Sequence, residues 1–150
     1  MPSITQKESP GVAQPIEIHC HRDICMLATE WRALQQVGIS SPFQHLDWML
    51  AQQQYLDAHT TSTPCVISLH QRETGNLLAL LPLRIEVKAG LRILRWMADD
   101  HANHHAGIFN REFLRTLSAE AFVPLWQRIR EHLPAHDLVW LRSQPVSLGP

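Results

Sequence analysis

The spacing of apolar residues in the first third of the chain predicts one strand followed by two helices. Residues 15–20 alternate apolar with polar side chains, which is the pattern of a short, half-buried strand. Apolar residues then recur at helical spacing over 24–37, directly after Asp23, which is suited to be the N-cap. The stretch 41–44, Ser-Pro-Phe-Gln, has the form of a capping box and predicts a second helix that ends near Ala58.

The middle of the chain predicts an antiparallel meander of three strands, at 65–71, 77–88 and 91–98, separated by short turn sequences. The second of these strands is apolar on both faces in its first half and alternates in its second half. It is therefore expected to run from a buried centre to a half-exposed edge. Pro82 lies inside it and predicts a bulge or a missing hydrogen bond, because proline has no N–H to donate.

The last third predicts a helix near 118–132 and a final strand at 137–143. The expected buried face of the helix consists of Phe122, Leu125, Trp126, Ile129 and Leu133. Pro124 must fall in the first turns of this helix or kink it. The final strand is apolar on both sides, which places it inside a sheet whose two faces are covered. The whole order predicts a mixed α+β fold, with a largely antiparallel sheet flanked by helices.

Composition and charge exclude several classes of protein. The formal net charge is −1, from 13 basic and 14 acidic residues, so no footprint for nucleic acid or an anionic membrane is expected. An odd, small number of cysteines, three, favours a reducing compartment. No apolar run approaches the roughly 18 residues of a membrane helix, and a cytoplasmic protein is predicted. Residues 1–14 are rich in Pro, Ser and Gln and are predicted to form a disordered leader.

The order of elements resembles the first two-thirds of the acyl-CoA N-acyltransferase (GNAT) fold. Four stretches, "EWRAL", "SPFQHLDWM", "LLALLPLRI…GLRILRWM" and "DLVWLRSQP", are similar to the N-terminal half of the CelD-like, FemAB-related acetyltransferases. The resemblance spans roughly Glu17 to Pro145. It implies that 15–150 is a GNAT-like N-terminal lobe and is truncated, because members of this group are usually more than twice this length and have two such halves.

The resemblance also implies a function and partners. It implies transfer of an acyl group from acetyl-CoA or another acyl-CoA to an amine, with no tightly bound cofactor. It further implies that a C-terminal GNAT half, or a second copy of the chain, covers the last apolar strand.

The loop after the third strand of the meander departs from the GNAT pattern. In that family a glycine-rich loop, Arg/Gln-x-x-Gly-x-Gly/Ala, lets backbone N–H groups approach the pyrophosphate. Here the loop reads "DDHANHHAGIF", in which Gly107 is the single glycine and two aspartates oppose a phosphate. This departure favours the alternative of a non-catalytic, degenerate lobe that serves substrate access or protein association.

The same loop holds the candidate substrate-binding residues: Asp99, Asp100, His101, His104 and His105. A histidine here is suited to be a general base for an acceptor amine, and the competing interpretation is a solvated loop with capping aspartates. The string lacks the glutamate and spacing of a metalloprotease helix, so no metal site is predicted. The same conclusion holds for a second group of metal-type ligands that no further pair completes: His19, Cys20, His21 and Cys25.

Two further sets of residues allow a structural and a functional interpretation. Arg84, Arg92 and Arg95 are either phosphate partners or the solvated faces of strands. The five tryptophans are expected in the core, because basic neighbours for nucleic-acid stacking are sparse.

Overall fold

The computed structural model describes residues 15–147. These residues form eight strands, four α-helices and three short 3₁₀ turns of three or four residues each. The predicted leader, 1–14, lies outside the described residues. The strands are β1 (Ile16–His21), β2 (Ser62–Pro64), β3 (Val66–Gln71), β4 (Leu77–Leu81), β5 (Leu83–Lys88), β6 (Leu91–Trp96), β7 (Ile108–Phe109) and β8 (Leu138–Val139). The helices are α1 (Ala28–Val37), α2 (Leu46–Tyr55), α3 (Arg111–Thr116) and α4 (Ala119–His132). The 3₁₀ turns are η1 (Ile24–Leu27), η2 (Pro42–Gln44) and η3 (Asp57–His59).

The strands form two sheets, and one antiparallel pair of segments runs through both of them. This pair, called the ribbon below, consists of β2 and β3 on one side and of β4 and β5 on the other. One sheet has the order β1-β3-β4-β7 and the other the order β2-β5-β6-β8. The same antiparallel register runs through both, since Ile67 pairs with Leu81 in the first sheet and Pro64 with Arg84 in the second. The mixed α+β class and the antiparallel meander are thus confirmed, although the predicted single sheet is two.

The ribbon changes sheet at Pro82 and, on the partner strand, at Cys65. Pro82 has no N–H to donate to the ladder, and its carbonyl accepts a hydrogen bond from the Met97 N–H at 2.9 Å instead. The N–H of Cys65 donates to the Leu83 carbonyl at 2.8 Å. The predicted strand at 77–88 is therefore two strands, with Pro82 as the point of division.

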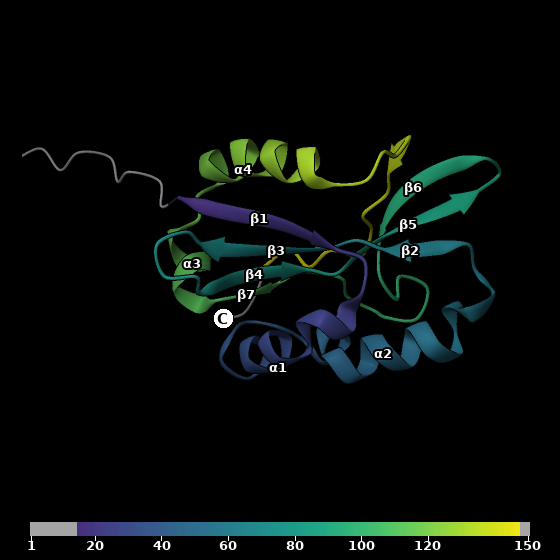
Figure 1. Ribbon diagram of the computed structural model, residues 1–150, viewed down its shortest axis with the longest axis horizontal. Helices are drawn as coiled ribbons and strands as arrows, with labels where there is room; N and C mark the ends of the chain where they lie inside the picture. The colour runs from purple at the N-terminus through teal and green to yellow at the C-terminus, as the bar shows by residue number, and fades with distance from the viewer. Residues whose placement is uncertain (1–14, 148–150) are drawn as a thin grey trace, which may run out of the picture.

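Helices cover both faces of the first sheet (Figure 1). On one face, Ile67 and Leu69 of β3 pack in a cluster with Leu125 and Ile129 of α4. On the other face, a second cluster joins Val66, Leu80 and Ile108 to α1, η1 and α2, and its largest member is the fully buried Trp31. In β3, the successive side chains Val66 and Ile67 thus enter different clusters, as the period of a strand requires.

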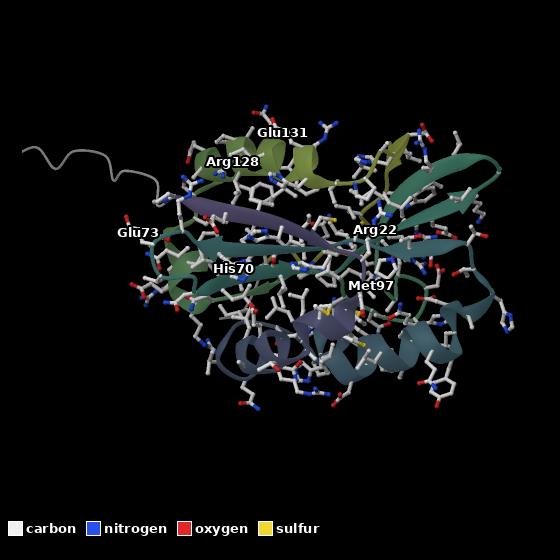
Figure 2. All side chains as sticks on the ribbon, in the orientation of Figure 1. Arg22, His70, Glu73, Met97, Arg128 and Glu131 are labelled. Carbon is white, nitrogen blue, oxygen red and sulfur yellow. The ribbon has the colours of Figure 1, made fainter. Side chains whose placement is uncertain are left out.

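Side chains follow the same division (Figure 2). Met97 lies on the side of the sheet that α1 and α2 cover, where it belongs to the second cluster. Arg128 and Glu131 lie on α4, on the opposite side, and Arg128 Nη2 donates to the Ile16 carbonyl at 2.6 Å. This bond ties α4 to β1 across the chain.

The predicted second helix, from 41 to about 58, is interrupted. The capping box of Ser41 and Gln44 is present, but it closes the single turn η2, and α2 begins only after His45, whose backbone is extended. Tertiary hydrogen bonds hold this break, because the Trp31 indole N–H donates to the Gln44 carbonyl at 2.9 Å and the Gln44 amide donates to the His104 carbonyl at 3.2 Å. The helix predicted for 24–37 likewise begins as η1, with Asp23 as its cap.

Three predictions about burial at the C-terminal end are wrong. The strand at 137–143 is only the two-residue β8, which pairs in parallel with β6 at the edge of its sheet and is exposed. Trp140 is 53% exposed, so it is not a core residue, and Phe122 of α4 is 42% exposed. The strand β8 is exposed because it lies at the edge of its sheet and pairs only with β6.

Within residues 15–147, no helix has the length and apolar character that crossing a membrane requires.

Candidate functional site

The structure separates the five loop residues that the sequence singled out. The side chains of Asp99 and His105 are buried and lie together, whereas Asp100, His101 and His104 are exposed. The backbone of His104 accepts the Gln44 bond, and its ring lies 6.5 Å from the ring of Phe43. The prediction of a solvated loop is therefore wrong for Asp99 and His105, which belong to the interior.

Asp99 is buried because arginines surround its carboxylate. Its side chain has no exposed surface, and its Oδ2 accepts from Arg95 Nε at 2.8 Å and Nη2 at 2.5 Å. Its Oδ1 accepts from Arg142 Nε at 3.1 Å. Asp100 joins the same two arginines, at 3.1 Å from Arg95 and 2.7 Å from Arg142. These bonds attach the segment after β8 to the loop after β6.

The charged cluster extends to Arg84 of β5, which is 2% exposed. Arg84 Nη1 lies 3.0 Å from Asp57 Oδ1 in η3, and Glu86 contacts both Arg84 and Arg95. The cluster thus holds three guanidinium groups and four carboxylates, which leaves no surplus positive charge for a phosphate.

Arg84, Arg92 and Arg95, which were considered as phosphate partners, each already lie within ion-pair distance of a carboxylate. Arg92 donates to both carboxylate oxygens of Asp137, and the other two belong to the buried cluster. The alternative of solvated strand faces is also wrong for Arg84 and Arg95, because carboxylates from other elements cover them. Arg142, which sequence reasoning missed, is the residue that links both aspartates to the C-terminal segment.

Two titration effects follow from this environment. Burial lowers the pKa of His105 and outweighs the opposing effect of Asp99, so the imidazole is neutral at pH 7. For Asp100, burial acts to raise the pKa, but the guanidinium of Arg95, aided by Arg84 and Arg142, outweighs it and holds the pKa below its usual range.

The tautomer of His105 follows from its partners. Its Nε2 lies 3.1 Å from the Asp99 carbonyl oxygen and 3.3 Å from Asp99 Oδ1, and both of these atoms only accept hydrogen bonds. Nε2 therefore carries the proton, and Nδ1 keeps a free lone pair. This arrangement, a neutral base held by a carboxylate behind it, is chemically suited to take up a proton.

A pocket of about 450 Å³ lies beside His105, where β6 and β8 diverge. The two parallel strands are joined as far as the bond from the Trp140 N–H to the Leu94 carbonyl, at 2.9 Å. Beyond it, the His105 N–H donates to the Ser143 carbonyl at 3.0 Å. The pocket, which includes Trp96 of β6 and Val139 of β8 in its lining, is called the wedge below.

The wall of this pocket is apolar and rich in aromatic side chains. It includes four aromatic residues, Trp96, Phe109, Phe122 and Trp126, together with the aliphatic Leu81, Val139 and Leu141. The rings of Phe122 and Trp126 are stacked, with centroids 6.3 Å apart. His105 and Gln144 are the polar side chains among the described lining residues, and no charged side chain is among them.

The indole N–H of Trp96 is a further feature of this region. It is buried and has no hydrogen-bond partner among the described residues. An unsatisfied buried donor costs about 1–3 kcal/mol.

No pattern in the sequence indicated that most of these residues would line a pocket. Phe122 and Trp126 were predicted as core residues of a helix, and only their position over the wedge makes them lining residues. His105 is the one candidate from the sequence that lines the pocket.

The residues considered as metal ligands do not converge. Within residues 15–147, no group of three or more His, Cys, Asp or Glu side chains is arranged to hold a metal ion. Cys25 is exposed. His19 and His21 lie on one face of β1, and Cys20, which stands between them in the sequence, lies on the opposite face.

Comparison of the chain with models of protein families, with curated proteins and with solved structures gives no match.

Proposed function

We propose that this chain is the N-terminal lobe of a GNAT-superfamily, CelD-like N-acyltransferase, which transfers an acyl group from acyl-CoA to an amine. The observation that carries the proposal is the apolar wedge between the parallel strands β6 and β8, with the neutral imidazole of His105 in its wall. Ligands of α/β proteins bind beyond the carboxyl ends of parallel strands, and the wedge lies at that end of both strands.

The strand connections support the same proposal. An antiparallel meander leads into β6, the chain then passes through β7, α3 and α4, and it returns as β8 in parallel with β6. Apart from the additional β7 and α3, this is the order that the resemblance implies for a GNAT-like lobe.

The proposed chemistry uses His105 as a base. The amine nitrogen attacks the thioester carbonyl, a C–N bond forms, the C–S bond breaks and CoA leaves as the thiolate. Nδ1 of His105 takes the proton that the amine loses, and the carboxylate of Asp99 stabilises the resulting imidazolium. The thioester carbonyl is also the type of acceptor that the Trp96 N–H lacks.

A degenerate lobe remains the second candidate, on a specific observation. The loop that would hold the pyrophosphate contributes Asp99 and Asp100 to a cluster in which carboxylates outnumber guanidinium groups four to three. A diphosphate is repelled by such a cluster, and a non-catalytic lobe needs no phosphate site.

Calorimetric titration of the 150-residue chain with acetyl-CoA and with CoA tests the two candidates. The acyltransferase predicts micromolar binding of acetyl-CoA, and release of free thiol when a panel of primary amines is added. His105→Gln should keep the binding and lose the thiol release, whereas His101→Gln, at an exposed histidine of the same loop, should keep both. Absence of binding up to millimolar acetyl-CoA would leave the degenerate lobe as the function.

A further inference from the structure

The pocket in the wedge is much larger than an acetyl group. A ligand site of about 450 Å³ lies within the range that accepts whole small molecules. A methylene group is close in volume to a water molecule, whose share of the liquid is roughly 30 Å³. Two carbons therefore fill a small part of the pocket, even when half of it is left to the arm that carries the thioester.

The lining also differs from what an acetyl group needs. Four aromatic and several aliphatic side chains form the wall, and no charged side chain is present among the described lining residues. Phe122 of α4 lines this pocket and is 42% exposed. Such a surface gains free energy when an apolar chain covers it.

We infer that the donor of this lobe carries a linear acyl chain of medium length, on the order of eight carbons, and that Phe122, Trp126 and Val139 contact the chain. This inference rests on the proposed function and names its substrate class. His105 and Gln144 are the polar groups of the wall, and they leave the carbonyl end of the chain as the polar end.

Two series of thioesters test the inference and separate it from the proposed function. The first is acetyl-, butanoyl-, hexanoyl- and octanoyl-CoA; the second carries the same acyl groups on N-acetylcysteamine, which lacks the nucleotide. Binding to the 150-residue chain is followed by calorimetry and by tryptophan emission, at thioester concentrations below self-association. Trp96 and Trp126 line the pocket, so emission should respond to chain entry.

In both series, Kd should fall by about fourfold for each added methylene, the value for full burial of a CH₂ group. Val139→Trp places an indole in the pocket, so affinity should stop rising beyond about four carbons. Leu138→Trp is the matched control, because Leu138 is the neighbouring exposed residue of β8 and does not line the pocket. Phe122→Ala should weaken octanoyl binding and spare acetyl binding, while Val123→Ala, next to it on α4 and outside the lining, should change neither.

Each result distinguishes the two ideas. Acyl-CoA binding that is independent of chain length would overturn the inference and leave the donor proposal in place. A chain-length dependence for the cysteamine series, with no gain from the nucleotide, would support the inference and remove CoA as the donor. A dependence that Val139→Trp does not alter would place the chain outside this pocket, and no binding in either series would overturn both.

Discussion

Asp99 and Asp100 are adjacent and chemically identical, yet their surroundings make them unequal. The Asp99 side chain has no exposed surface and bonds to Arg95 and Arg142, while the Asp100 side chain is 51% exposed. Removing one partner of a buried ion pair is costly, because the remaining charge stays buried without compensation. An exposed pair is screened by water and contributes little.

We therefore predict that Asp99→Asn lowers the free energy of unfolding by about 3 kcal/mol, since Arg95 keeps its burial and loses one of its carboxylate partners. Asp100→Asn should lower it by less than about 1 kcal/mol. Urea unfolding of the two variants beside the wild type gives both values, and equal losses would contradict the buried cluster.

The burial of His105 sets the direction in which the stability of the protein changes with pH. Burial lowers its pKa in the folded protein, so below about pH 6.5 the unfolded chain binds a proton that the folded chain does not. The free energy of unfolding should therefore decrease as the pH falls below about 6.5. Above that pH, His105 should cause no loss of stability.

In His105→Gln this decrease should become shallower, by up to about 1.4 kcal/mol per pH unit, the limit for one proton. Urea midpoints at intervals from pH 7.5 to pH 5 measure the slope. His101→Gln controls for the loss of an exposed histidine in the same loop. An unchanged slope in His105→Gln would show that other groups cause the acid sensitivity.

At the scale of elements, Gly38 joins α1 to the first sheet. It follows the last residue of α1, and the next residue, Ile39, exchanges backbone hydrogen bonds with Phe109 of β7, at 2.8 and 3.1 Å. A Cβ at Gly38 would lie 2.7 Å from the carbonyl oxygens of both Leu34 and Phe109. Both are backbone atoms, so neither can rotate away.

Gly38→Ala should therefore cost about 1–3 kcal/mol, the range for overpacking, with α1 displaced from β7. The control is Val37→Ala, one residue earlier and exposed, which should be close to neutral. Thermal unfolding compares the variants, and faster hydrogen exchange at Ile39 in Gly38→Ala would report the displacement. A stability equal to wild type would show that the junction can relax.

Elements were predicted well where local patterns act alone and poorly where distant groups decide. The helix α4 has its buried Leu125 and Ile129 where the spacing placed them. The break between η2 and α2 was not predictable, because the bonds that hold it come from Trp31 and His104, which are distant in the sequence.

For the molecule as a whole, β8 is an exposed apolar edge of the second sheet. Leu138, Val139 and Trp140 are each more than two-fifths exposed, and β8 is an edge strand. Exposed apolar edges favour association with another chain.

We predict that the chain self-associates through this edge, so that its mass by light scattering rises with concentration above that of a monomer. Leu138→Lys should shift the chain towards the monomer, because a charge on an edge strand opposes pairing. A well-behaved wild-type monomer at all concentrations would refute the prediction.

Patterns along the sequence predicted the local features: most of the strands and helices, an irregularity at Pro82, the caps at Asp23 and Ser41, and His105 as a residue to consider. These depend on hydrogen bonds and side-chain periods within a few residues. Tertiary contacts were needed to show that one ribbon serves two sheets, that Asp99 is paired with arginines from two segments, and that aromatic side chains of α4 line the wedge between β6 and β8. Burial and charge pairing depend on residues far apart in the chain, and a pattern along the chain does not contain those distances.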